Sequence, residues 1–152
     1  MKVLSVLGTR PEAIKMAPVI RELEKYPGDV EAKVCVTGQH RQMLDQMLAL
    51  FNVTCDYDLN LMQRNQSLSR LTARALAELD AVIGRQQPDW VLVQGDTTTA
   101  MVASLVAFSC RKFLNPPRCG QPSSDDKRLP DWLPWPWLYR LEPVPNPAAV
   151  DR

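Results

Sequence analysis

The sequence has little of what metal centres, disulfide frameworks and membrane spans require. It contains one histidine, and its four cysteines form no C-x-x-C pair, so we expect no metal ion and interpret the cysteines as free thiols rather than zinc ligands or disulfides. No apolar run approaches the roughly 18 residues of a membrane-spanning helix. The apolar run from Val3 to Gly8 is too short for a signal peptide. The sequence therefore predicts a cytoplasmic protein with no membrane partner.

An excess of charge of either sign is also missing. Lys and Arg together number 18 and Asp and Glu 17, which gives a net charge of +1. No long-range field would draw such a chain to a polyanion, so we expect no nucleic-acid partner. The 152 residues, 45% of them hydrophobic, suffice for one domain with a real core.

Strands and helices alternate over the first 108 residues. Continuous apolar runs predict strands, and apolar residues at helical spacing predict helices. The predicted strands are 2–8, 31–38, 55–61 and 89–95, and the predicted helices are 11–26, 40–51, 67–85 and 96–108. We expect Ser67 to cap the third helix and Pro18 to kink the first. Such a βαβ series predicts an α/β fold with a doubly wound, parallel, Rossmann-like sheet.

The pattern changes at about Ser109. Nine of the 13 prolines lie beyond this residue, and neither the helical nor the alternating period continues. We therefore expect a partial N-terminal Rossmann-like domain over 1–108 and an irregular, disordered Pro/Trp-rich tail over 109–152. Two hypotheses for the tail stay open: out-of-frame translation after a frameshift with an early stop, or a segment that acts as a polyproline ligand or touches a membrane.

Three loops follow predicted strands and carry polar side chains: 8–12, 38–41 and 95–98. In a parallel sheet these loops share one edge, where ligands bind. In the first, Gly8 permits a sharp turn, and the free N–H groups of the following helix suit a phosphate. Arg10 adds a fork of donors, and Lys15 lies further along the helix. The alternatives are a surface-loop role for Arg10 and a solvated charge for Lys15.

The other two loops contain the sole histidine and a carboxylate. His40 can act as an acid or base, or it can be a surface or capping group. Asp96 directly follows the fourth predicted strand, where a carboxylate can serve as a base or stabilise developing positive charge. Its alternative is to cap the next helix.

Four blocks carry more than a generic pattern: GTRPEAIKMAP (8–18), VTGQHRQMLDQ (36–46), DYDLNLM (56–62) and VLVQGDTTTA (91–100). In this order they closely resemble the N-terminal half of the bacterial non-hydrolysing UDP-N-acetylglucosamine 2-epimerases, in register from Met1 to about Phe108. The resemblance implies part of a GT-B fold, in which two Rossmann-like domains hold substrate between them. It also implies that UDP-GlcNAc and UDP-ManNAc interconvert by anti elimination and re-addition of UDP, as a step in polysaccharide biosynthesis.

The resemblance also implies roles for single residues. Gly8, Thr9 and Arg10 match substrate-binding positions, with Arg10 and Lys15 neutralising the departing diphosphate. Lys15 and Asp96 match catalytic positions, Asp96 being one of the family's carboxylates. No cofactor is implied, the ligands are UDP-GlcNAc and UDP-ManNAc, and intact members form homodimers.

An activator site for the substrate is implied at Gln39 and Gln42. The sequence departs from the family at Gln94, where His is usual, and at Gly38, where Ala is common. Two further carboxylate motifs, like G-H-V-E-A-G-L-R-T and P-E-E, do not occur in it. We therefore expect this chain to be inactive by itself, the alternative function being a non-catalytic truncated remnant or an interaction module.

Overall fold

The structure is a computed structural model that describes residues 1–38, 41–63 and 65–113. The predictions on Gln39, His40 and the segment 114–152 lie outside the described residues. In chain order the elements are β1 (Lys2–Leu7), α1 (Arg10–Leu23), β2 (Glu31–Val36), α2 (Arg41–Leu50), β3 (Tyr57–Asp58), α3 (Leu68–Gln86), β4 (Trp90–Leu92) and α4 (Thr98–Phe113).

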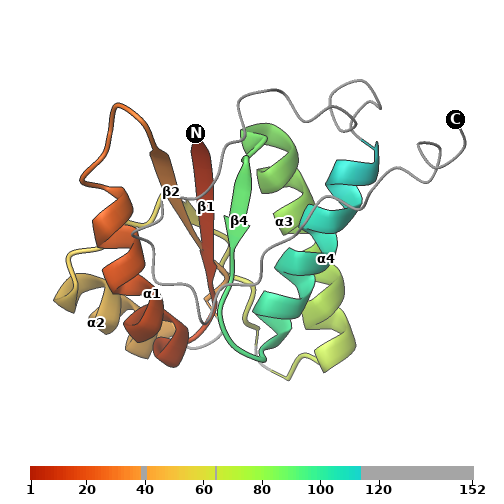
Figure 1. Ribbon diagram of the computed structural model, residues 1–152. Coiled ribbons are helices and arrows are strands. Elements are labelled where there is room, and N and C mark those ends of the chain that lie inside the picture. The colour runs from red at the N-terminus through yellow and green to blue at the C-terminus, as the bar shows by residue number, and fades with distance from the viewer. Residues whose placement is uncertain (39–40, 64, 114–152) are drawn as a thin grey trace, which may run out of the picture.

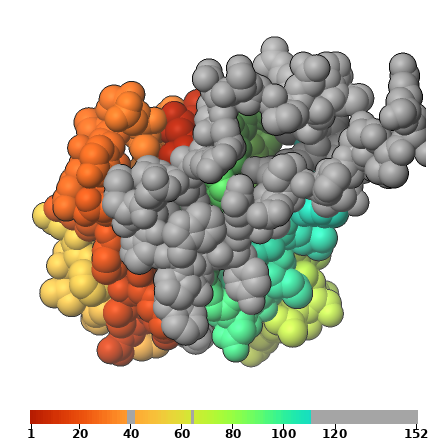
Figure 2. All heavy atoms as spheres, in the orientation of Figure 1, coloured from red at the N-terminus to blue at the C-terminus, as the bar shows by residue number. Residues whose placement is uncertain are grey.

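The strands form one parallel sheet in the order β3-β2-β1-β4. Figure 1 shows α1 and α2 on one face of the sheet and α3 and α4 on the other. The same two pairs of helices lie at opposite sides of the space-filling view in Figure 2. The predicted α/β, Rossmann-like fold with helices on both faces is confirmed.

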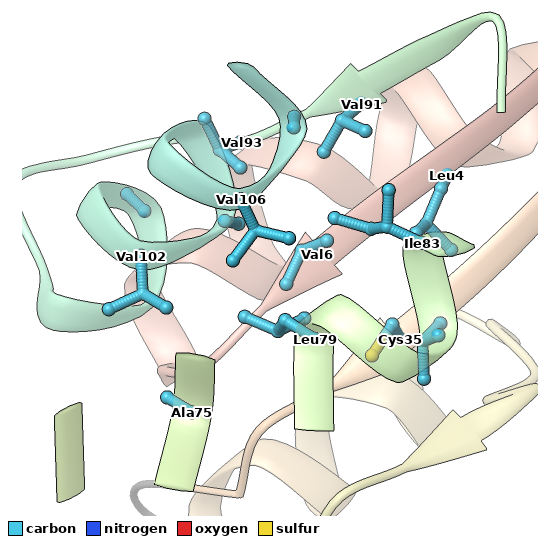
Figure 3. Packing of buried hydrophobic residues seen from close by; sticks show 14 of the residues in the cluster. Leu4, Val6, Cys35, Ala75, Leu79, Ile83, Val91, Val93, Val102 and Val106 are labelled. Atoms are coloured by element: carbon cyan, nitrogen blue, oxygen red, sulfur yellow. The ribbon is translucent and has the colours of Figure 1, made fainter. Parts of the chain in front are cut away.

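The central strand β1 supplies side chains to two hydrophobic clusters. Val3 and Leu7 pack with α1 and α2, whereas Leu4 and Val6 pack with α3 and α4. In Figure 3 Leu79 of α3 points toward β1 within the second cluster. Because both faces of β1 are buried, its sequence is a nearly continuous apolar run, as parallel strands require.

Helix boundaries follow local signals. The side chain of Ser67 accepts a hydrogen bond of 3.3 Å from the N–H of Arg70, so the predicted cap of α3 is confirmed. Helix α1 continues through Pro18 to Leu23.

The observed bounds of the elements differ from the predicted ones by up to five residues, for example in β3, β4 and α4. Strand β3 is limited to Tyr57–Asp58, and Asn60 after it adopts a left-handed φ of 43°, although the N–H groups of Leu59 and Leu61 still donate to Val36 and Thr37. Strand β4 is likewise limited to Trp90–Leu92. The prediction that regular structure ends near Phe108 was wrong at its boundary, because α4 continues to Phe113 and Cys110 packs against the α3/α4 cluster. The division into 1–108 and 109–152 stays a prediction.

Candidate functional site

The loops that follow β1 and β4 meet at the carboxyl edge of the sheet. The two strands are direct neighbours, with Val3 opposite Trp90 and Ser5 opposite Leu92. The chain then enters α1 and α4, whose first turns lie at the lower end of the sheet in Figure 1. This edge is the usual position of a ligand in an open parallel sheet.

A buried carboxylate joins these two loops. Glu12 is 2% exposed. Its Oε2 accepts hydrogen bonds from the N–H groups of Gly8 at 2.6 Å and Thr9 at 3.0 Å. Its Oε1 accepts a hydrogen bond of 2.5 Å from the hydroxyl of Thr97. The N–H groups of Gly8 and Thr9, two of the predicted substrate-binding residues, are therefore bound within the chain.

Gly8 is required by packing. A Cβ atom built on Gly8 would overlap Oγ1 of Thr99 and lie 2.8 Å from Oγ1 of Thr37. These two hydroxyls are buried and share a hydrogen bond of 2.8 Å. The first turn of α4 and the residue after β2 thus both press against the loop after β1. The predicted sharp turn at Gly8 needs no left-handed φ, which among the described glycines occurs at Gly38 and Gly95.

Lys15 approaches the end of β4. With the Gln94 amide oriented so that its oxygen faces two donors, that oxygen accepts from Lys15 Nζ and from the Gly95 N–H, each at 3.2 Å. Gln94 is buried, whereas Lys15 is exposed on α1. The ammonium group is therefore held at the same edge as the two loops rather than pointing freely into solvent.

Arg10 and Asp96 are both exposed, in the first turn of α1 and just before α4. Neither forms a hydrogen bond or ion pair with another described residue. Asp96 was given helix capping as its alternative role, but the cap is Thr97, whose Oγ1 accepts from the N–H of Ala100 at 3.2 Å. The exposed Asp96 carboxylate is thus not engaged as the cap of α4.

The remaining predicted position, Gln42, is exposed in the first turn of α2. It does not belong to the network of Glu12, Gly8, Thr9 and Thr97. Its role as part of an activator site stays a prediction.

The three cysteines in the described part of the chain, Cys35, Cys55 and Cys110, take no part in the hydrogen bonds of Glu12 and Thr97 at this edge. Burial raises the pKa of the Cys35 thiol from 9.0 to about 12. Burial also raises the pKa values of Cys55 and Cys110. Within the part of the chain that the structure describes, no group of three His, Cys, Asp or Glu residues could hold a metal ion. None of the helices described is both long and apolar enough to span a membrane.

Sequence reasoning overlooked Glu12. The signal was present, because Thr9 followed three positions later by Glu12 matches the T-x-x-E capping box of a helix start. In the structure the Glu12 carboxylate does accept from the N–H of Thr9, and it also reaches across to Thr97. The second contact depends on the fold and has no signature in the sequence.

The chain is similar to proteins of one family. A family model described as UDP-N-acetylglucosamine 2-epimerase matches residues 21–112. The UDP-N-acetylglucosamine 2-epimerase of Salmonella typhimurium is 59% identical over 108 residues, which are 71% of this chain and 28% of that protein.

Solved structures of UDP-GlcNAc 2-epimerases are also similar to this chain. The crystal structure of UDP-GlcNAc 2-epimerase from Neisseria meningitidis bound to UDP-GlcNAc superposes with a TM-score of 0.68 and 58% identity, over 72% of this chain and 29% of that one. The enzyme from Methanocaldococcus jannaschii in complex with UDP-GlcNAc and UDP gives a TM-score of 0.67 and 34% identity, over 73% and 30% of the two chains. The chain thus spans less than a third of the length of these relatives.

Proposed function

Because this chain belongs to the UDP-N-acetylglucosamine 2-epimerase family, we propose that it serves the interconversion of UDP-GlcNAc and UDP-ManNAc, a step that supplies polysaccharide biosynthesis. One observation carries the proposal: Arg10 in the first turn of α1 and Asp96 just before α4 are exposed at the carboxyl edge of the sheet, and neither side chain is paired with another described residue. A cation and a carboxylate that lie at the same edge of the sheet, neither of them paired with another described residue, suit a ligand that combines a diphosphate with a reacting sugar.

The diphosphate is assigned to the loop after β1. Arg10 offers a planar fork of donors to phosphate oxygens, and Lys15 adds a second cation one turn further along α1. Gly8 and Thr9 contribute by shaping the loop, since their N–H groups donate to Glu12. Charge that develops on the departing UDP is thereby neutralised by side chains held on a rigid helix.

The sugar is assigned to the loop after β4. In the proposed reaction a base removes the proton at C2 while the C1–O bond breaks and its electron pair leaves with UDP. UDP and a proton then add to the resulting 2-acetamidoglucal, and delivery of the proton to the opposite face gives the epimer. Asp96 is the candidate catalytic carboxylate in this chain, because Thr97 rather than Asp96 caps α4.

Ligand binding is tested on the purified chain by titration calorimetry with UDP. Losing a charge-assisted hydrogen bond costs roughly 1.5–3 kcal/mol, so Arg10→Ala is expected to weaken UDP binding about 10- to 100-fold. Arg21→Ala is the matched control, since Arg21 lies on the same helix but pairs with Glu24 near its C-terminal end. The control should change affinity less than about twofold. Equal effects of the two substitutions, or no binding of UDP to the unaltered chain, would overturn the assignment.

Turnover is tested separately by incubating the chain with UDP-GlcNAc in D₂O. Formation of UDP-ManNAc, or deuterium at C2, supports an active chain, and Asp96→Asn should abolish both while leaving UDP binding intact. UDP binding with neither product nor exchange would favour the non-catalytic alternative for this chain.

A homodimer and a cytoplasmic location complete the proposal. The cysteines Cys35, Cys55 and Cys110 are free thiols, in keeping with a reducing compartment. Light scattering of the purified chain measures its mass, and a monomer at all concentrations would contradict the homodimer.

A further inference from the structure

The hydrogen bonds of Glu12 do more than cap a helix. Its two carboxylate oxygens are divided between two loops: Oε2 binds the N–H groups after β1, and Oε1 binds the Thr97 hydroxyl after β4. The first loop precedes Arg10 and the second contains Asp96. We infer that Glu12 is a positioning residue that fixes the separation of Arg10 and Asp96, an inference that rests on the function proposed above.

Burial makes this connection strong. A carboxylate that is 2% exposed is costly unless it is hydrogen-bonded, so Glu12 holds its three donors firmly. All three donors belong to the two loops, the N–H groups of Gly8 and Thr9 after β1 and the hydroxyl of Thr97 after β4. The Thr97 hydroxyl is held at its other side as well, because its oxygen accepts from the N–H of Ala100. Thr97 thus connects Glu12 to the first turn of α4.

The loop after β4 needs such a support. Gly95 adopts a φ of 94°, a conformation that glycine enters readily, so the backbone before Asp96 has little intrinsic preference for one direction. A Cβ built on Gly95 would lie 3.7 Å from Cγ of Glu12, so the Glu12 side chain lies close to this loop as well as bonding Thr97 within it. The Glu12–Thr97 hydrogen bond therefore selects one direction for the Asp96 carboxylate.

The test separates this role from helix capping. Thr97→Ser keeps the hydroxyl, and hence both the cap and the donor to Glu12. Thr97→Asp keeps a good N-cap but places a second carboxylate against Glu12. Adding Glu12→Gln to Thr97→Asp restores a donor between the two side chains and the net charge of the unaltered chain. Ser67→Asp is the matched control, because Ser67 caps α3 without facing a carboxylate.

The primary measurement is the ¹⁵N order parameter of the Asp96 amide, which needs no ligand. We expect about 0.85 in the unaltered chain, in Thr97→Ser and in Ser67→Asp, and below about 0.6 in Thr97→Asp. The double substitution should return to the higher value. An Asp96 amide as rigid in Thr97→Asp as in Thr97→Ser would overturn the inference, as would failure of the double substitution to restore order.

The affinity for UDP is the second measurement. Thr97→Asp should weaken it at least tenfold, and the double substitution should recover it to within about threefold. If the unaltered chain binds no UDP, the proposed function is wrong, and the order parameters still decide whether Glu12 positions Asp96. If UDP binds and Thr97→Asp leaves its affinity unchanged, the proposed function stands and the inference is wrong.

Discussion

Replacing Gly8 by alanine is expected to destabilise the fold through a single added methyl group. The new Cβ would overlap Oγ1 of Thr99 and lie 2.8 Å from Oγ1 of Thr37 and 2.9 Å from Cβ of Thr99. Overpacking of this kind costs about 1–3 kcal/mol. If Thr99 turns away, the buried hydrogen bond to Thr37 is lost as well, at about 1–3 kcal/mol more. With both contributions, we expect Gly8→Ala to lower the free energy of unfolding by about 2–6 kcal/mol.

Urea denaturation followed by circular dichroism measures this change, and the melting temperature should fall by roughly 4–24 °C. Gly84→Ala is the matched control, because Gly84 is exposed near the end of α3 and a Cβ there meets nothing within 4 Å. It should stabilise the chain by about 0.5–1 kcal/mol through helix propensity. Combining Gly8→Ala with Thr99→Ala removes the overlapping oxygen, so the double substitution should cost less than the sum of its parts. A Gly8→Ala chain that unfolds at the urea concentration of the unaltered chain would refute the reasoning.

Two further predictions concern ionisable side chains. Because its pKa is raised, Cys35 has about 10³-fold less thiolate near neutral pH than an ordinary thiol has. Iodoacetamide at pH 8 should therefore label Cys35 at least that much more slowly in the native chain than in urea, as measured by mass spectrometry. Equal labelling rates would contradict the burial of Cys35. The hydrogen bond and ion pair with Asp56 raise the pKa of Lys33 above 10.5, so their contribution to stability is complete below pH 10.5 and is lost as the pH rises through that higher pKa. In urea titrations Lys33→Gln should therefore differ from the unaltered chain at pH 8, by less than about 1 kcal/mol for so exposed a pair, and the difference should shrink as the pH rises above 10.5. A difference that does not change with pH would show that the charge is not the cause.

The order and type of the elements were predictable, because each buried strand and each amphipathic helix is recorded in its own apolar pattern. The start of α3 was also predictable, because the Ser67 hydroxyl caps the helix by accepting from the nearby N–H of Arg70. Boundaries were less predictable. At the start of α4 an aspartate is followed by three threonines, all of which can cap a helix, and only the contact of Thr97 with Glu12 selects one of them.

The candidate site was predictable as a set of loops but not as a network. The resemblance and the strand pattern together pointed to Arg10, Lys15 and Asp96, which the fold brings to one edge of the sheet. The contact of Lys15 with Gln94 and that of Glu12 with Thr97 join segments far apart in the chain. No local rule of sequence records such contacts, since they arise only when β1 and β4 pair.

The central place of β1 has a consequence for the chain as it leaves the ribosome. Strand β1 is synthesised before both of its neighbours, β2 and β4, and β4 comes much later than β2. Met1 bonds Asp29, 28 positions away, whereas Lys2 bonds Asp89, 87 positions away. Closing the longer span costs about 1 kcal/mol more in chain entropy, and synthesis of the intervening residues takes roughly 3–12 s. During that interval one side of β1 is an unpaired apolar edge, so the nascent chain is most open to chaperones and to wrong partners just before β4 emerges.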